Sequence, residues 1–416
     1  MKESRRRIKD LKSQLEGKRG DLSMLGICPM SEEIVRASFR EAERKDFAPM
    51  FVATPRQVDA DRGYTGWSQK ELVKFLRSTA EDEGYESVYL LARDHGGPYQ
   101  SVRDRDDPKV SLNDAMKYAK ELFAEDVRAG FDIVHVDATE DPTVEGALDL
   151  NEVADRTVEL ISSIEKVREE EDLSGVHYEV GTEEITGGMT RPEEFERFIN
   201  LLKSSLSERK LNHVEDRLLF IVGQVGTTMR IDMTNKFEFD QAEKLVKIAS
   251  QGDLFLKVHY TDWLDDSILE EFPKLGVGGA NVGPEFAASL VEALEVLEGK
   301  EKSALEGVNK GLSKMMDSLE WAAIRESPWQ RFAPEEMDDQ ELAEFAQDHS
   351  RKIAICVGRY VMNNPEVVSS RRKLYQNIEE HTSVEDPHEL VIENIRESIS
   401  RYVKAFNLPG SAKKFE

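Results

Sequence analysis

His95 and His259 each follow a short aliphatic run of the kind that forms a buried strand. Imidazole nitrogens bind zinc, manganese and iron, and a carboxylate beside two histidines completes three protein ligands, with one position left open for a substrate oxygen. We therefore expect His95, His259 and Glu183 to bind a divalent metal ion, Zn, Mn or similar. Asp137 and Gln224 compete with Glu183 as the third ligand, and hydrogen bonding to a nearby loop is the alternative for each histidine.

Asp94 directly precedes His95, and the pair is more specific than either residue alone. One of the two side chains can bind a metal ion while the other moves a proton at the same carbon atom of a small molecule. We therefore predict that Asp94 is a catalytic acid or base. The alternative is that Asp94 caps the turn that follows it.

Polar side chains also follow the other predicted strands. If these strands form a parallel barrel, the loops after them converge on the face where barrels carry their chemistry. An arginine fork suits a phosphate or a carboxylate, although Arg93 could equally pair with a nearby acid. Gly278 and Gly283 lie where barrels often bind phosphate, or they allow close strand packing. The predicted substrate-binding residues are Thr54, Gln57, Arg93, Gln224, Asp262 and Asn281.

Eight aliphatic or β-branched runs can supply the strands, starting at residues 24, 49, 88, 131, 176, 218, 254 and 277. Most intervals hold one βα unit of about 30 residues, and eight units close a parallel barrel. The sequence thus predicts an α/β fold, a (β/α)8 TIM barrel over residues 22–300, with an N-terminal helical segment over 1–21 and a C-terminal helical extension over 301–416. A dinucleotide fold is disfavoured because the glycine-rich stretch comes late and has Asn281 where the third glycine is required.

Strand alternation predicts which charged side chains enter the barrel. His135 and Asp137 point inward if the valines between them face the outer helices. By the same rule Glu179 and Lys257 point inward, and because an unpaired charge there is costly, we expect them to form a buried ion pair below the site. The alternative, a Schiff base on Lys257, is disfavoured because a lysine beside a carboxylate stays protonated.

Composition excludes several classes of function. The chain has 416 residues, with 82 acidic and 56 basic side chains and a formal net charge of −26. Nucleic-acid backbones bind clustered Lys and Arg, so a nucleic-acid binder of the basic-patch type is excluded. No window approaches the ~18 consecutive apolar residues of a membrane span. Two cysteines, Cys28 and Cys356, are too few for a disulfide framework and favour a cytoplasmic location. The predicted C-terminal helices could serve as a lid or as a contact between subunits. We expect a contact between subunits, and hence a homo-oligomer.

Seven motifs occur in family order over about residues 25–290 and carry a resemblance to a known family. They resemble the non-catalytic subunit family of class II D-tagatose-bisphosphate aldolase, which also contains sugar 4-epimerases acting on ketohexoses, their phosphates and hexuronates. The tail is similar too, through ESPWQRF and HSRKIAICVGRYVMNNPEV. The seven motifs are GICPMSEEIVRASFREA, VATPRQVDADRGYTGWS, RDHGGP, HVDATEDP, GTEEITGG, VHYTDW and NVGPEFA.

The resemblance implies a metal-dependent, aldolase-like barrel. It also implies that Asp94, Glu183 and Asp137 are catalytic carboxylates and that His95 and His259 bind the metal ion.

Three departures from the family pattern line the same predicted pocket. Residues 224–226 read Gln-Val-Gly where a Gln-Pro-Gly type is usual, residues 28–30 read Cys-Pro-Met where small polar residues are common, and Arg93 stands where glycine is usual. The resemblance therefore leaves the substrate open.

Two hypotheses of function follow from the sequence. In the first, the chain is an enzyme that epimerises a ketose, ketose phosphate or hexuronate at C4, or cleaves it reversibly as an aldolase does. A divalent metal ion acts as Lewis acid, and Asp94 or Glu183 exchanges the proton. In the second, the chain is a non-catalytic subunit that stabilises a separate class II aldolase subunit, which predicts a large apolar surface patch and no turnover alone.

Overall fold

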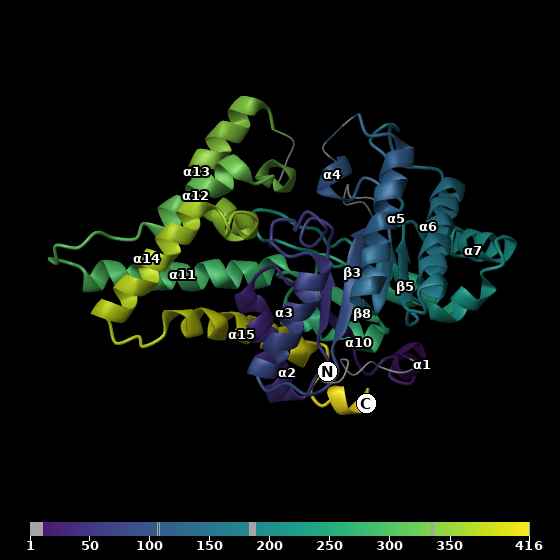
Figure 1. Ribbon diagram of the computed structural model, residues 1–416, viewed down its shortest axis with the longest axis horizontal. Coiled ribbons are helices and arrows are strands. Elements are labelled where there is room, and N and C mark those ends of the chain that lie inside the picture. Colours follow the sequence, from purple (N-terminus) through teal and green to yellow (C-terminus); the bar gives the residue numbers. More distant parts are fainter. Residues whose placement is uncertain (1–10, 106, 108, 183–188, 334–336, 416) are drawn as a thin grey trace.

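The computed structural model describes residues 11–105, 107, 109–182, 189–333 and 337–415, and its centre is a closed barrel of eight parallel strands (Figure 1). Each strand pairs with its neighbours in sequence, and β1 pairs with β8 to close the ring. The predicted (β/α)8 barrel and all eight of its strands are therefore confirmed. The strands are β1 (Met24–Ile27), β2 (Met50–Ala53), β3 (Leu90–Gly96), β4 (Ile133–Val136), β5 (His177–Gly181), β6 (Leu218–Val222), β7 (Phe255–Val258) and β8 (Gly279–Val282).

The strands are buried on both faces, as a parallel sheet covered by helices requires. β6, with the sequence LLFIV, is buried along its whole length. Small residues let β8 approach its neighbours, because a Cβ atom on Gly278 would lie 2.4 Å from Phe255 Cβ, and one on Gly283 would lie 2.8 Å from Cys28 Sγ. Packing thus accounts for both glycines.

Amphipathic helices cover the outside of the barrel. α3 shows how they are specified: Ser68 and Glu71 form a capping box at its start, and Leu72 and Leu76 are buried one turn apart. The helices and 3-10 turns of the barrel are α2 (Glu32–Lys45), α3 (Gln69–Asp82), α4 (Val102–Arg105), α5 (Leu112–Ala129), α6 (Leu150–Glu170), α7 (Pro192–Glu208), η1 (Asn212–Arg217), α8 (Phe239–Gln251), α9 (Asp266–Leu269), α10 (Glu271–Leu275) and α11 (Pro284–Ala304).

The C-terminal helices fold back onto the barrel. α15 packs against α2 and α11, while α12 and α13 lie beside the upper end of the barrel (Figure 1). Because α11 continues past residue 300, the division of the chain at that position stays a prediction. The C-terminal elements are α12 (Met315–Glu326), η2 (Trp329–Phe332), α13 (Asp339–Val357), η3 (Gly358–Tyr360), α14 (Pro365–His381), α15 (Pro387–Ala405) and η4 (Ala412–Lys414).

The short N-terminal helix α1 (Leu11–Glu16) lies at the end of the barrel where the strands begin. Lys12 Nζ is 2.6 Å from Asp253 Oδ2, and the Arg19 guanidinium lies 3.9 Å from the centre of the Phe255 ring. The predicted N-terminal helix is therefore present within residues 11–16. Among the described residues, none of the helices has both the length and the apolar character needed to cross a membrane.

Candidate active site

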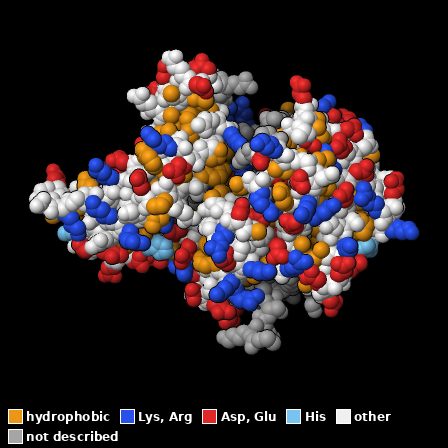
Figure 2. Space-filling model, turned by 45° about the horizontal axis from the view of Figure 1, so that its top comes forward, with side chains coloured by type: hydrophobic (Ala, Val, Ile, Leu, Met, Phe, Trp, Pro, Cys, Tyr) orange, Lys and Arg blue, Asp and Glu red, His pale blue; other side chains and the backbone are white. Residues whose placement is uncertain are grey.

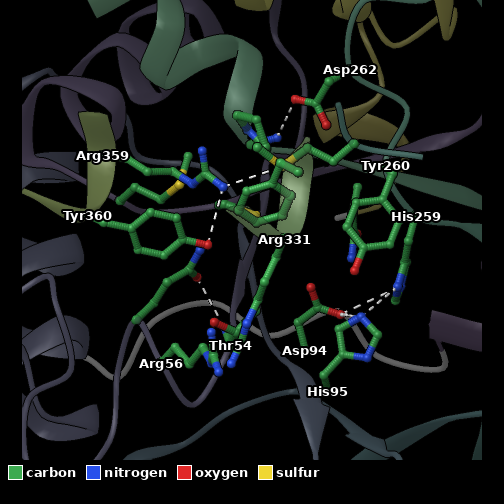
Figure 3. Close-up of a pocket in the computed structure, with 18 of the residues that line it drawn as sticks. Thr54, Arg56, Asp94, His95, His259, Tyr260, Asp262, Arg331, Arg359 and Tyr360 are labelled. Atoms are coloured by element: carbon green, nitrogen blue, oxygen red, sulfur yellow. Dashed lines mark hydrogen bonds and ion pairs between the residues drawn. The ribbon is translucent and has the colours of Figure 1, made fainter. Parts of the chain in front are cut away.

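A cavity of about 260 Å3 opens where the strands end (Figure 3). Its walls come from the ends of the barrel strands and the loops after β1, β2, β3, β6, β7 and β8, and from Arg331, Phe332, Arg359 and Tyr360 of the C-terminal part of the chain. This is the face on which barrel enzymes place their chemistry.

Four buried side chains, Asp94, His135, Glu179 and His259, converge at the floor of this pocket. Each offers a ligand atom, and these atoms all lie within 4.8 Å of one another. His259 Nε2 lies 3.1 Å from Glu179 Oε1 and 3.5 Å from Asp94 Oδ1. Asp94 Oδ1 is buried and accepts no hydrogen bond from the described residues, which is costly for a carboxylate oxygen. Mixed imidazole and carboxylate donors around such an atom fit a divalent cation such as Zn or Mn.

His95 lies beside this cluster and connects it to Asp137. Its Nε2 is 3.0 Å from His259 Nδ1, and its Nδ1 is 2.8 Å from Asp137 Oδ2. The two histidines therefore lie side by side, and their shared metal binding stays a prediction. Asp137 also accepts hydrogen bonds from Gln100 (3.0 Å) and Thr139 (2.5 Å), and it lies behind His95, outside the pocket lining. The contacts of Asp137 therefore orient His95, and its role as a catalytic carboxylate stays a prediction.

The irregular end of β3 brings both Asp94 and His95 to the site. In a regular strand, consecutive side chains point to opposite faces. The β3–β4 pairing shifts register between Arg93 and Gly96, and His95 has a φ of 47°, in the left-handed region. The backbone N–H of His95 donates to His135 Nδ1 at 3.2 Å. This local change of direction returns the His95 side chain to the pocket.

Glu179 and Lys257 form the predicted buried ion pair, with a separation of 2.6 Å and no exposed side-chain area. However, Glu179 Oε1 also faces His259. Glu179 therefore belongs to the cluster as well as to the ion pair, and the pair does not lie wholly below the site. Burial opposes ionisation of Glu179, but the positive charge of Lys257 and the hydrogen bond with His259 prevail and lower its pKa to about 2. Glu179 is therefore a charged ligand candidate at neutral pH.

Asp94 is the carboxylate of the cluster that also lines the pocket. Burial alone would raise its pKa, but the positive charges of His259 and His95 hold the pKa of Asp94 well below its usual range. An ionised carboxylate at this position can accept a proton from a bound molecule. Glu183 lies outside the described residues, so its roles as metal ligand and catalytic carboxylate stay predictions.

Most of the predicted substrate-binding residues line the cavity. Asn281 is 5% exposed, and neither its amide nitrogen nor its amide oxygen makes a hydrogen bond to a described residue. Gly26 provides the space for this side chain, because a Cβ atom there would lie 2.2 Å from Asn281 Oδ1. The residues predicted to bind substrate that line the cavity are Thr54, Gln57, Gln224, Asp262 and Asn281.

Arg93 is the exception, and its prediction as a substrate-binding residue is wrong. Its side chain is fully buried away from the cavity and makes a bidentate ion pair with Asp126 of α5 at 2.8 and 2.6 Å. It also donates to the carbonyl oxygens of Ala53 and Val58, both at 2.9 Å. The alternative explanation, an ordinary partner for a nearby acid, is confirmed.

Sequence reasoning missed two groups of site residues. Strand alternation predicted that His135 and Glu179 point into the barrel. It does not predict how close to the carboxyl ends of the strands, and so to the site, these side chains lie. Arg331, Arg359 and Tyr360 come from the C-terminal helices, where periodicity predicts helices but not their contacts. The tail motifs ESPWQRF and HSRKIAICVGRYVMNNPEV, which contain these three residues, are the signal that could have found them.

Comparison with known proteins places this site in a family context. Over residues 11–385 the chain matches the D-tagatose-1,6-bisphosphate aldolase subunit GatZ/KbaZ-like family. The chain belongs to this family. The D-tagatose 6-phosphate 4-epimerase of Agrobacterium fabrum is 27% identical over 285 residues, which cover 65% of this chain and 66% of that relative. The D-tagatose-1,6-bisphosphate aldolase subunit GatZ of Escherichia coli O1:K1 is 25% identical over 306 residues, which cover 69% and 70% of the two chains.

Solved structures show the same fold. A probable tagatose 6 phosphate kinase from Sinorhizobium meliloti 1021 has a TM-score of 0.75 and 20% identity, with 92% of this chain and 100% of that chain covered. Fructose-bisphosphate aldolase from Campylobacter jejuni has a TM-score of 0.57 and 10% identity, with 96% and 94% covered. At these identities the similarity shows the fold alone. The family resemblance read from the motifs is confirmed by the family match.

Proposed function

We propose that this chain is a metal-dependent enzyme that epimerises a ketose, ketose phosphate or hexuronate at C4, or cleaves it reversibly as an aldolase does. The observation that carries this proposal is the buried cluster of Asp94, His135, Glu179 and His259 at the floor of the pocket. Relatives named as a sugar-phosphate 4-epimerase and as aldolase subunits support the carbohydrate chemistry.

The four residues of this cluster, with His95 at its edge, would hold the cation. The buried Asp94 Oδ1, which faces the histidines without a hydrogen bond to a described residue, and the two kinds of donor atom fit this role. A divalent cation bound there would act as a Lewis acid on a ketose oxygen and stabilise negative charge. Asp137 orients His95, and Lys257 holds Glu179, as partners behind metal ligands commonly do.

Asp94 is the residue that we assign to proton transfer. One of its carboxylate oxygens faces the histidines, and the other points away from them into the pocket (Figure 3). Asp94 accepts the proton of the C4 hydroxyl as the C3–C4 bond breaks, which leaves an aldehyde carbonyl at C4 and the electron pair of that bond on the fragment that carries C3. Rotation of the aldehyde, bond formation on its other face and return of the proton invert C4. Cleavage and epimerisation therefore require the same groups.

Metal removal tests the proposal. The purified chain would be treated with a chelator and assayed with ketohexoses, their phosphates and hexuronates, before and after addition of Zn or Mn. We expect turnover of one of these classes to disappear with the metal ion and to return when it is added. Full activity of metal-free protein, or a failure to bind any divalent cation, would contradict the proposal.

The alternative is a non-catalytic subunit of a class II aldolase, and it is supported by the relatives named as GatZ subunits. Under this alternative the chain shows no turnover with any of the three sugar classes, even when it is loaded with metal ion. When the chain is mixed with a class II aldolase subunit, the thermal midpoint of that aldolase subunit would then rise. The rise would be the same with a variant of the chain that lacks the Asp94 carboxylate.

A further inference from the structure

Arg359 is a buried cation in the wall of the pocket, only 7% exposed. Its guanidinium donates to the carbonyl oxygen of Cys356, to Tyr360 Oη at 3.2 Å and to Met229 Sδ at 3.3 Å. It forms no ion pair with any carboxylate in the described part of the chain. Asp262 is the nearby carboxyl that interacts electrostatically with Arg359, without an ion-pair contact. A buried charge without a directly paired carboxylate is costly, so this position favours an anion brought in by a ligand.

The pocket around Arg359 is rich in positive charge, although the whole chain carries a net charge of −26. Arg56, Arg105 and Arg331 also line it. The Arg331 side chain runs across the pocket toward Thr54 and Arg56 (Figure 3). Lys and Arg side chains are also visible where the C-terminal helices meet the barrel (Figure 2). Such clustering raises the local concentration of anions.

Few negative charges oppose these arginines. The carboxylates that line the cavity are Asp94, which faces the histidine cluster, and Asp262. Burial and the negative charge of Glu285 raise the pKa of Asp262 to about 7, against the hydrogen bonds that it accepts from the backbone at the start of α11. Asp262 is therefore only partly charged at neutral pH, and the arginine side of the cavity stays positive.

The position of Arg359 is fixed before any ligand binds. Tyr360 packs edge-to-face on Tyr64, with ring centres 4.9 Å apart, and Asn363 Nδ2 donates to the Tyr64 carbonyl oxygen at 2.9 Å. These contacts join η3 to the loop after β2. A guanidinium held in this way loses little conformational entropy on binding.

We propose that Arg359, assisted by Arg331 and Arg56, binds an anionic terminal group of the substrate, a phosphate or a carboxylate, and so makes the C-terminal helices the part of the chain that selects charged over neutral sugars. The guanidinium fork suits both oxyanions. That the bound anion belongs to a sugar rests on the proposed function, in which the carbon skeleton of the sugar lies over Asp94. The binding of the anion does not depend on turnover.

Binding of inorganic phosphate to chelator-treated full-length protein, measured by calorimetry, tests the anion site without the metal ion. We expect Arg359→Gln to weaken phosphate binding by about 10- to 100-fold, the effect of losing one charge-assisted contact. The control is Arg372→Gln, which removes the same charge from an exposed site on α14 outside the cavity and is expected to leave binding unchanged. Equal phosphate affinity in the native chain and Arg359→Gln would overturn the proposal, as would an equal loss in the control.

Sugar binding to the metal-loaded protein distinguishes the two oxyanions. A ketohexose 6-phosphate, a hexuronate and a neutral ketohexose would be compared by calorimetry. We expect at least one anionic sugar to bind more tightly than the neutral one, and this preference to disappear in Arg359→Gln; the tighter anionic sugar identifies the group. A preference that persists in the variant overturns the proposal.

Folding and the metal site are checked separately. Thermal melting and metal content identify a variant that has failed to fold. Arg359→Lys, which keeps the charge, is expected to retain part of the phosphate binding, and Arg331→Gln, at an exposed position, carries the same test if both Arg359 variants unfold. Anion binding without metal-dependent turnover would contradict the proposed function but not this site.

Discussion

His95 and Tyr260 both have backbone angles that are uncommon for residues with side chains, with φ values of 47° and 56°. Both lie at the carboxyl end of a strand, β3 and β7 respectively, and both line the pocket. Such conformations cost on the order of 1–3 kcal/mol each and persist where the surrounding structure holds them. At β3 the result is that His95 and Asp94 reach the same cavity, which a regular strand would prevent.

His259 is the side chain on which the cation site depends most, because it lies next to both Glu179 and His95. We expect His259→Ala to weaken Zn or Mn binding by more than about 100-fold, since even partners behind metal ligands contribute about 10- to 100-fold. We expect Asp137→Asn to weaken metal binding by about 10- to 100-fold, because Asp137 acts through His95. Competition with a chromogenic chelator measures both affinities.

A histidine outside the pocket provides the control for this experiment. His381→Ala, on α14, removes an imidazole without touching the cluster and should leave metal affinity unchanged. If His259→Ala binds the cation as tightly as the native chain does, the four-residue cluster is not the metal site.

Glu165 of α6 is a buried carboxylate that connects this helix to β5 and to the start of β6. It accepts hydrogen bonds from the Tyr178 hydroxyl and from Arg217 Nη1, the latter at 2.9 Å, and Arg168 Nε lies 3.2 Å away. Burial would raise its pKa, but the hydrogen bonds from the two arginines and Tyr178 lower it to about 2. The ionised form of Glu165 therefore stabilises the wall of the barrel behind β5.

The pH dependence of folding should report this carboxylate. Because the folded-state pKa of Glu165 lies below its unfolded value, its contribution is complete above about pH 4.5 and is lost as the pH falls toward 2. We expect Glu165→Gln to lower the free energy of unfolding at pH 7 by about 2 kcal/mol, a value reduced because the partner arginines are partly exposed to solvent. The difference from the native chain should shrink by pH 3, measured by urea unfolding.

An exposed glutamate of the same helix is the matched control. Glu170→Gln removes the same charge from an exposed site of α6 and is expected to change stability by less than about 0.5 kcal/mol at either pH. A Glu165→Gln deficit that is as large at pH 3 as at pH 7 would mean that side-chain shape, and not ionisation, accounts for the effect.

The strands could be predicted because each is specified by its own aliphatic residues, buried on both faces. The polar residues after them could be predicted because parallel strands end on one face. Arg93 could not be predicted correctly, since its direction depends on the register shift in β3 and on Asp126, a residue of a helix further along the chain. Arg359 could not be predicted because its place in the pocket depends on how helices distant in the sequence pack.

Polar contacts add to the apolar packing between the C-terminal helices and the barrel. Arg396 of α15 lies 2.9 Å from Glu41 of α2, whose side chain is fully buried. Arg401 of α15 donates to Glu285 at the start of α11, at 2.8 Å. These pairs fix α15 against α2 and the start of α11.

Arg396→Met tests this attachment. The change leaves Glu41 buried with only the half-exposed Arg44 nearby, so we expect the free energy of unfolding to fall by about 2–4 kcal/mol. The double variant Glu41→Leu with Arg396→Met removes both charges and should recover most of the loss, as measured by urea unfolding. An unchanged stability in the single variant, or no recovery in the double variant, would show that the pair does not fix α15 to α2.

The pocket is assembled from two distant stretches of one polypeptide, with Asp94 and His259 on the floor and Arg331 and Arg359 in the wall. Under the proposed function, exchange of the tail between family members would alter which sugars are admitted while the residues on the floor stay the same. A single gene segment could then change substrate preference without rebuilding the barrel.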